Sequence, residues 1–237
     1  MTSVVAFSGG KDSTVLVLRM HELGEEFTLF FTPTGNELPE LCVHVAKIAA
    51  MVERPVMTTK GPTLAQAIES ENSLPNPRMR WCTRLIKIVP CIAYLKTLAN
   101  PTLCVGLRAD EEERQGLYGD HATYRYPLRE WGWGLREVYG YLRKRGVNVP
   151  TRTDCAVCPF QRLGEWWKLW RDHPDEYEQG VQWEAQIGHT FRSDSRDTWP
   201  ASLAELRLKF EAGHIPRGAA QLQLEEDAPV ACRVCSL

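Results

Sequence analysis

The sequence predicts a doubly wound α/β fold with a mostly parallel sheet, followed by a helical, cysteine-bearing C-terminal part. Three observations lead to this prediction. Short apolar runs rich in β-branched and aromatic residues alternate with segments of helical periodicity over residues 1–128. A glycine-rich loop joins the first apolar run to the first helical segment. Over residues 129–237 helical, tryptophan-rich segments replace the strand signals, and we expect this second region to pack on the first.

The strands and helices of the first region are expected to alternate. The apolar runs predict strands at Ser3–Phe7, Phe27–Thr32, Arg54–Thr59 and Thr102–Leu107. Helical periodicity is present at Ser13–Leu23, Leu38–Val52 and Leu85–Leu98. The first helix is expected to end at Gly24, and Pro90 predicts a kink in the third. This order is typical of βαβ units, whose strands run parallel and whose helices cover both faces.

The second region reads as a layer of helices. Helical segments are expected at Arg162–Gly188 and Pro200–Ala212, and another follows a tryptophan-rich loop within residues 128–146. Three tryptophans have the spacing of a stripe that faces the core, namely Trp166, Trp167 and Trp170. We therefore expect them to be core residues rather than platforms for stacked bases.

The composition narrows the class of protein. The net charge of −2 gives no overall basic footprint of the kind that many nucleic-acid-binding proteins carry, although a local basic patch is compatible with it. Residues 9–12 interrupt the first apolar run too early for a signal peptide, and no apolar stretch approaches the ~18 residues of a membrane span. We expect a cytoplasmic protein with no membrane contact and no disulfides.

The loop between the first strand and the first helix has the chemistry of a phosphate site. It reads Ser8, Gly9, Gly10, Lys11, Asp12 and Ser13. Backbone N–H groups at a helix N-terminus have no partners within the helix and attract an anion, and the glycines allow a phosphate to come close. The lysine adds positive charge, the serines add hydroxyl donors, and the aspartate could cap the helix or lie near Mg²⁺. The alternative is an ordinary turn, which has no need of the lysine.

Several segments resemble one known superfamily. The loop resembles the PP-loop of the N-type ATP pyrophosphatases, in the adenine nucleotide alpha-hydrolase-like superfamily. Four further segments resemble its PAPS reductase branch: "TPTGNELPE" (32–40), "RWCTRLIKIVP" (80–90), "VGLRADEEER" (105–114) and "CAVCPFQRLGEWWKLWRDHPDEY" (155–177). The last is also similar to the DNA phosphorothioation subunit and to phage-encoded relatives. The resemblance covers residues 4–184, and Pro33 stands where the family usually has Asp.

The resemblance implies an adenine nucleotide site built from three segments. Its expected residues are Ser8, Gly9, Gly10, Lys11, Asp12, Ser13, Thr34, Gly35, Glu37, Gly106, Arg108 and Arg114. The residue chemistry agrees, because Arg108 and Arg114 flank an acidic run directly after a strand, where open α/β sheets bind ligands. Arginine suits phosphate and carboxylates suit Mg²⁺, whereas the alternative is a solvated run of charge. The residues expected to be catalytic are Lys11, Asp12, Arg108 and Cys82.

Three interpretations of the cysteines compete. In the first, Cys82, Cys155 and Cys158 hold a 4Fe–4S iron–sulfur cluster, whose fourth iron is bound by Cys235 from the tail or has no protein ligand. The resemblance supports this interpretation. In the second, the two Cys-x-x-Cys pairs hold Zn²⁺. In the third, Cys232 or Cys235 is a mobile redox thiol, which the neighbouring Arg233 would activate.

Basic residues surround Cys82 in the sequence. They are Arg78, Arg80, Arg84 and Lys87. They could contact a nucleic-acid backbone, hold nucleotide phosphates or lie on a solvated surface. His44 is assigned a structural or surface role, because the histidines show no metal-ligand spacing.

The resemblance favours an ATP-dependent enzyme that adenylates a substrate and then transfers sulfur with the help of the cluster. Its acceptor would be a nucleic acid or nucleobase, and its partners a sulfur donor or a DNA-binding protein. One alternative is a reductase of PAPS or adenylyl sulfate, with Cys232 or Cys235 as the nucleophile. A second is a non-catalytic regulatory protein that binds a nucleotide and a cluster beside a DNA-binding partner, for which Pro33 is the motivating feature.

Overall fold

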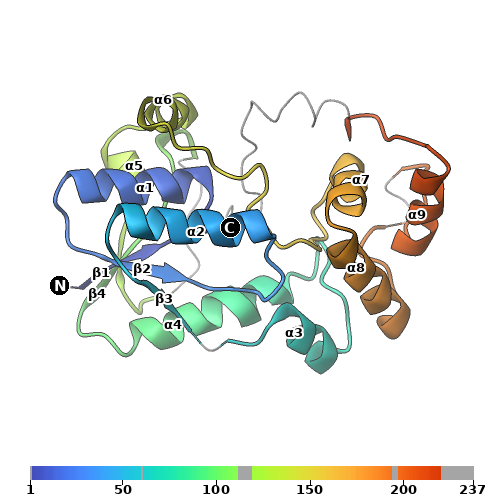
Figure 1. Ribbon diagram of the computed structural model, residues 1–237. Coiled ribbons are helices and arrows are strands. Elements are labelled where there is room, and N and C mark those ends of the chain that lie inside the picture. Colours follow the sequence, from blue (N-terminus) through green and yellow to red (C-terminus); the bar gives the residue numbers. More distant parts are fainter. Residues whose placement is uncertain (1, 60, 112–118, 194–196, 220–237) are drawn as a thin grey trace.

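The computed structural model describes residues 2–59, 61–111, 119–193 and 197–219 (Figure 1). Of the residues singled out above, Arg114, Cys232, Arg233 and Cys235 lie outside these ranges. Among the described residues, no helix combines the length and the apolar character needed to cross a bilayer.

A five-stranded parallel sheet forms the centre of the first region, which confirms the predicted α/β class. Its strands are β1 (Thr2–Ala6), β2 (Thr28–Phe31), β3 (Val56–Thr58), β4 (Pro101–Cys104) and β5 (Thr123–Arg125), in the order β3-β2-β1-β4-β5. Val5 is aligned with Leu29 on one side and with Cys104 on the other. The chain thus builds outward from β1 to β3 and then returns to β4 on the other side of β1. The carboxyl ends of β1 and β4 therefore form a topological switch point, where open α/β sheets bind ligands.

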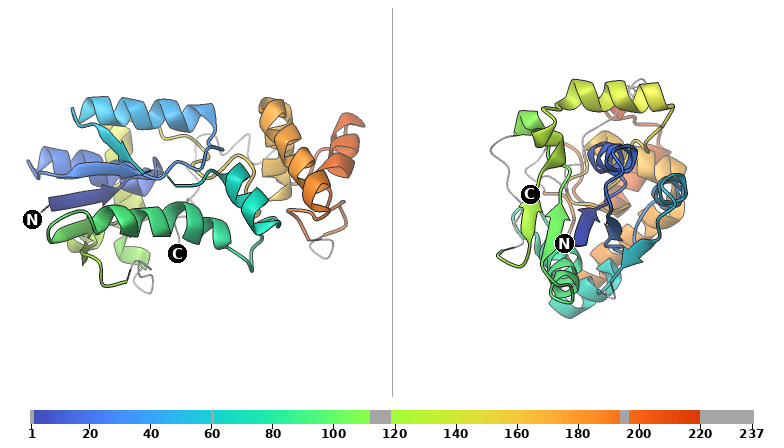
Figure 2. Two further views of the ribbon diagram at one scale, coloured as in Figure 1. Left: turned by 90° about the horizontal axis from the view of Figure 1, so that it is seen from below. Right: turned by 90° about the vertical axis from the view of Figure 1, so that its left-hand side faces the viewer.

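Helices cover both faces of the sheet (Figures 1 and 2). One face carries α1 (Lys11–Glu22), α2 (Pro39–Met51) and α6 (Leu135–Arg145), and the other carries α4 (Val89–Leu95). Neighbouring residues of a strand point to opposite faces, so Val5 joins the core under α1 and α2 while Val4 joins Leu95 under α4. The short helix α5 (Pro127–Glu130) follows β5.

The remaining helices lie beyond the carboxyl ends of the strands (Figure 1). They are α7 (Leu163–Asp172), α8 (Pro174–Ile187) and α9 (Leu203–Glu211). Their core is continuous with Leu38 and with α3 (Leu64–Glu71), so this part is packed against the sheet region. Trp166 is fully buried and Trp167 nearly so, which confirms the predicted core role of these two tryptophans.

The structure differs from the sequence-based expectation in two helical segments. The predicted regular helix at residues 85–98 is a π-helix over Thr83–Ile88 that continues directly into α4, with Pro90 in the first turn of α4. Helix α6, which we assigned to the second region, packs on α1, and its Val138 and Leu142 belong to the core of the sheet. The division at residue 128 stays a prediction.

Candidate nucleotide and thiol site

The glycine-rich loop lies at the switch point between the end of β1 and the start of α1. Gly9 has a φ of +75°, and a Cβ there would lie 2.4 Å from Leu41 Cδ1, so both backbone conformation and space require glycine. Gly10 is the N-cap of α1 and makes no side-chain cap bond. The first N–H groups of α1 therefore remain for an anion, as the sequence predicts.

Two serines fix the shape of this loop. Ser13 Oγ donates to Gly10 O at 3.1 Å and accepts from Ser8 N at 3.3 Å. The hydroxyls of Ser8 and Ser13 are 3.2 Å apart. Lys11 is only 3% exposed, and its Nζ lies 3.2 Å from Asp12 Oδ2. The loop is thus held open by its own hydroxyl groups, with a buried cation at its helical end.

The segment after β4 meets the loop at close range. A Cβ on Gly106 would lie 3.1 Å from Ser13 N, so only glycine permits this approach. Two residues later Arg108, 8% exposed, places Nη1 3.0 Å from Asp12 Oδ2 and Nε 2.8 Å from Asp110 Oδ1. Arg108 thereby joins the PP-loop to the acidic run, and it brings together the phosphate-binding chemistry expected from both segments.

The carboxylate of Asp12 fits a divalent cation. Burial raises the pKa of Asp12, against the opposing influence of Lys11 and Arg108. Its Oδ2 accepts from those two residues, whereas its Oδ1 is buried and has no hydrogen-bond donor. A buried carboxylate oxygen without a donor suits Mg²⁺, which prefers oxygen ligands and usually takes only one or two from protein.

A tight turn follows β2, the strand beside β1. Glu37 Oε1 accepts from both Thr34 N and Thr34 Oγ1 at 2.6 Å, and its Oε2 accepts from Gly35 N at 3.0 Å. The turn places Thr34, Gly35 and Glu37 at the same edge of the sheet as the PP-loop. Their predicted contact with the nucleotide stays a prediction, since Glu37 is engaged in shaping the turn itself.

The first Cys-x-x-Cys segment is attached to this turn. Asn36 O accepts from Ala156 N at 2.7 Å, and Asn36 Oδ1 accepts from Val157 N at 2.9 Å. Cys155 Sγ donates to Thr34 Oγ1 at 3.4 Å, and Glu37 forms an antiparallel bridge with Cys155. The sequence gives no sign of this attachment, because the partners are about 120 residues apart.

The thiols of Cys82, Cys155 and Cys158 all lie at the junction of the sheet and the helical part. Burial raises the pKa of all three, to about 11 for Cys155. No three His, Cys, Asp or Glu side chains within the described ranges come close enough together to hold a metal ion. As placed, these thiols do not fit a cluster or zinc site, and Cys235 is not described. The predicted cluster and the zinc alternative therefore stay predictions, and we assign no step to either.

Arg80 lies between two of these thiols. Its guanidinium stacks over the ring of Phe160 at 4.6 Å. Burial lowers the pKa of Arg80, and the groups that oppose this shift are the thiols of Cys82 and Cys158. Among the four basic residues noted around Cys82, Arg78 and Arg84 are exposed, whereas Arg80 and Lys87 are part-buried. Lys87 lies close enough to Cys82 and Cys155 to act on their thiols, and Arg80 has buried nitrogen atoms.

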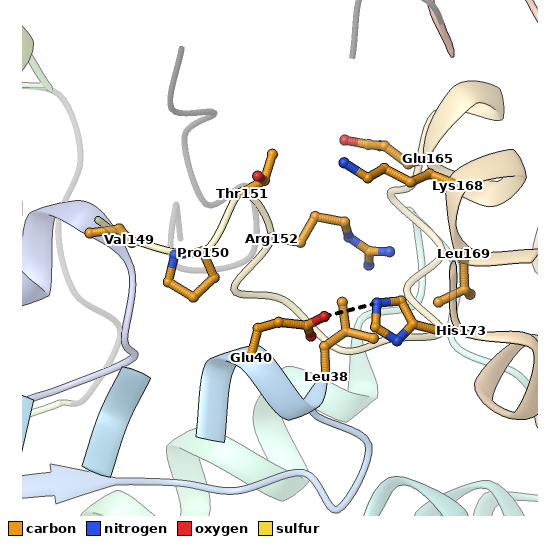
Figure 3. A pocket seen from close by; sticks show the side chains of 10 residues that line it. All are labelled: Leu38, Glu40, Val149, Pro150, Thr151, Arg152, Glu165, Lys168, Leu169 and His173. Atoms are coloured by element: carbon orange, nitrogen blue, oxygen red, sulfur yellow. Dashed lines mark ion pairs between the residues drawn. The ribbon is translucent and has the colours of Figure 1, made fainter. Parts of the chain in front are cut away.

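A cavity of about 240 Å³ opens between α2, the segment Val149–Arg152 and α7 (Figure 3). Arg152 and Lys168 point into it, and the Glu40–His173 ion pair at 3.3 Å closes one side. Arg152 also donates to Cys155 O at 2.8 Å, so the cavity borders the cysteine loop. The sequence could not reveal it, because its walls come from three separate segments.

Comparison with known proteins adds a family and relatives. The phosphoadenosine phosphosulfate reductase domain family matches residues 2–166. Two uncharacterized proteins of Methanocaldococcus jannaschii are 25% and 26% identical over 227 and 200 residues, 87% and 76% of this chain. The chain spans 54% and 40% of the length of these relatives. A crystal structure of PAPS reductase from Candida auris, in a phosphate complex, is similar with a TM-score of 0.51, covering 62% of this chain and 74% of that chain. At its 17% identity this likeness shows the fold alone.

Proposed function

The chain belongs to the phosphoadenosine phosphosulfate reductase domain family, and from this premise we propose that it is an ATP-using PP-loop enzyme. It adenylates an oxygen of a nucleic acid or nucleobase and releases pyrophosphate, and sulfide-level sulfur from a donor then bonds to the activated acceptor as AMP leaves. The observation that carries this proposal is the Ser8–Ser13 loop: an uncapped helix N-terminus at the switch point, with Lys11 and Arg108 beside it. That arrangement suits the polyphosphate of ATP.

The proposed division of labour follows from the geometry. The first N–H groups of α1 bind the β- and γ-phosphates, and Lys11 and Arg108 neutralise the charge that develops on the leaving pyrophosphate. An oxygen of the acceptor attacks the α-phosphorus, which forms the new P–O bond as the bond to pyrophosphate breaks. Asp12 would hold Mg²⁺ through Oδ1, and the ion would supply further neutralisation of the phosphates.

The second half of the reaction is proposed for the edge of the sheet beyond the PP-loop. The turn at Thr34–Glu37 separates the loop from Cys155, and the cavity beside Arg152 borders the same cysteine segment. An acceptor that occupies this cavity would reach from the thiols toward the α-phosphate. Its apolar walls and mixed charges suit a nucleobase better than a polyanion.

Reduction of PAPS is the second candidate, and the family match favours it. The Candida auris relative is a PAPS reductase in a phosphate complex. In that case the PP-loop would hold the phosphates of PAPS, and the nucleophile would come from Cys232 or Cys235. The intact lysine and aspartate of the loop favour ATP, because they provide the charge pair that a Mg²⁺-polyphosphate needs.

Thermal unfolding with Mg-ATP or PAPS separates these candidates. A ligand at 100 times its Kd adds about 2.7 kcal/mol, which raises the Tm by several degrees. We expect stabilisation by Mg-ATP, with loss of that shift in Lys11→Ala and its retention in Lys47→Ala, which removes an exposed lysine of α2. Pyrophosphate release by the wild type then tests turnover. Stabilisation by PAPS alone would exclude the adenylating function and support the reductase.

A further inference from the structure

Residues 80–83 gather buried hydrogen-bond donors that have no acceptor. They are Arg80 Nε, Arg80 Nη2, Trp81 Nε1 and Thr83 Oγ1. Buried polar groups are nearly always hydrogen-bonded, and each one left without a partner destabilises the folded protein. Four such donors on three of four successive residues therefore need an explanation, and a ligand that supplies acceptors provides one.

The geometry of Arg80 indicates what kind of acceptor this is. Nε and Nη2 form one edge of the guanidinium, and their N–H bonds point the same way, which suits two oxygens of one oxoanion. The stack on Phe160 fixes the plane of the group. Thr83 N donates to Arg80 O at 3.1 Å, so a single turn brings the two side chains to one side of the chain. Thr83 Oγ1 can then serve a third oxygen, which a phosphate or sulfate group has and a carboxylate lacks.

The charge of the surrounding sequence agrees with an anionic ligand. Residues 72–109 contain no Asp or Glu and six basic residues, namely Arg78, Arg80, Arg84, Lys87, Lys96 and Arg108. Arg80 has no ion pair with a carboxylate among the described residues. The π-helix Thr83–Ile88 also begins at this point, and π-helical turns occur frequently at functional sites.

We infer that Arg80 and Thr83 form a binding site for a terminal tetrahedral oxoanion, a phosphate or sulfate group, next to Cys82 and Cys158. The site is separate from the PP-loop, and it does not depend on which nucleotide that loop binds. The donor atoms are covered although the two residues are part-exposed, so entry requires a shift of the Arg80 side chain. This favours a terminal group on a slender molecule over the phosphodiester of a nucleic-acid backbone.

Protection of Cys82 from alkylation tests the inference locally. The full chain carrying Lys11→Ala, which weakens anion binding at the PP-loop, is treated with iodoacetamide in sodium sulfate, sodium phosphate or sodium chloride at equal ionic strength. Peptide mass spectrometry then gives the alkylation rate of Cys82. An oxoanion at ten times its Kd should slow that rate about 11-fold relative to chloride. Protection by sulfate alone or by phosphate alone would identify the group that the substrate carries.

Three variants assign any protection to Arg80. Arg80→Gln should weaken oxoanion binding by at least about tenfold, because it removes two charge-assisted hydrogen bonds. Arg80→Lys keeps the positive charge and serves as the test variant if Arg80→Gln does not fold. It should lose most of the protection of Cys82, because lysine cannot present two N–H groups to one oxoanion. Arg84→Gln removes the same charge from an exposed position, so the oxoanion should slow Cys82 alkylation in this variant as much as in the parent chain.

Two results would overturn the inference. One is a Cys82 alkylation rate that is the same in sulfate, phosphate and chloride. The other is equal protection in the Arg80→Gln and Arg84→Gln chains. A failure of the proposed ATP-dependent function is detected in a different measurement: Mg-ATP would then not raise the Tm of the chain that keeps Lys11. Arg80→Gln should leave that stabilisation unchanged.

Discussion

Acidification should lower the free energy of unfolding because of His44, a residue of α2 that contacts the first turn of α1. His44 Nε2 lies 2.9 Å from Thr14 Oγ1, and both side chains are buried beneath the PP-loop. Burial, aided by the charge of Lys47, lowers the pKa of His44 from 6.5 to about 4. The folded protein therefore holds His44 neutral, whereas the unfolded chain takes up a proton below pH 6.5.

The sign and size of the effect follow from linkage. Because the folded state binds this proton more weakly, the free energy of unfolding falls as the pH drops from 6.5 toward 4. For these two pKa values the loss due to His44 between pH 7 and pH 5 is about 2 kcal/mol, and it approaches roughly 3 kcal/mol below pH 4. Other groups titrate in the same range, so the wild type must be compared with a variant that lacks only this proton.

His44→Gln is that variant, since an amide can still hydrogen-bond to Thr14 but does not titrate. We expect urea unfolding to give similar stabilities for the two proteins at pH 7, and a wild type weaker than the variant by about 2 kcal/mol at pH 5. His44→Leu, which leaves the Thr14 hydroxyl unpaired, should be about 1–3 kcal/mol less stable than His44→Gln at both pH values, because neither variant titrates at this position. If the wild type and His44→Gln lose equal stability on acidification, His44 is not a neutral buried group and this reasoning fails.

Three further predictions concern the loop, the arginine beside it and the helical part. Gly9→Ala should abolish the Mg-ATP thermal shift, because a Cβ would meet Leu41, whereas Gly24→Ala, with a similar φ but open space, should cost only about 1–2 kcal/mol and keep the shift. Arg108→Gln should lower Mg-ATP affinity by at least about tenfold in a calorimetric titration, since it leaves the carboxylates of the site without their shared cation; unchanged affinity would remove Arg108 from the site. Burial raises the pKa of Glu184 to about 7, so its stabilising contribution is complete below pH 4.5 and is lost as the pH rises through 7. Relative to Glu184→Gln, the wild type should lose about 3 kcal/mol in urea unfolding between pH 4.5 and pH 8, and parallel pH profiles would contradict this.

The features that the sequence predicted well depend only on residues that are close together in the chain. Strands β1 and β2 are short apolar runs, and the PP-loop combines glycines, lysine and hydroxyl residues within six positions. Both can be recognised without knowledge of the remaining fold. The resemblance placed Asp12 and Arg108 in one nucleotide site, and their side chains do form an ion pair in the structure.

The features that escaped prediction depend on contacts between distant segments. β5 has three residues and no apolar run, so only its pairing with β4 defines it. The attachment of the Cys155 loop to Asn36 joins two backbone N–H groups to the main-chain and side-chain oxygens of Asn36, and nothing in the sequence pairs segments so far apart. The burial of the unpaired Arg80 donors likewise depends on residues that are distant in the sequence and pack around them. Composition placed Arg80 in a basic run but could not say that its side chain faces inward.

The π-helix Thr83–Ile88 is in effect an α-helix that carries one residue too many. Removing one residue from it would restore regular i→i−4 bonding, and it would rotate everything before it by about 100° around the axis of α4. The shortened chain would gain a better helix and lose the stack of Arg80 on Phe160 together with the placement of Cys82. The π-helix therefore fixes the positions of Arg80 and Cys82 at the expense of regular helical hydrogen bonding. Relatives with and without the extra residue should therefore differ in the chemistry at this position rather than in fold.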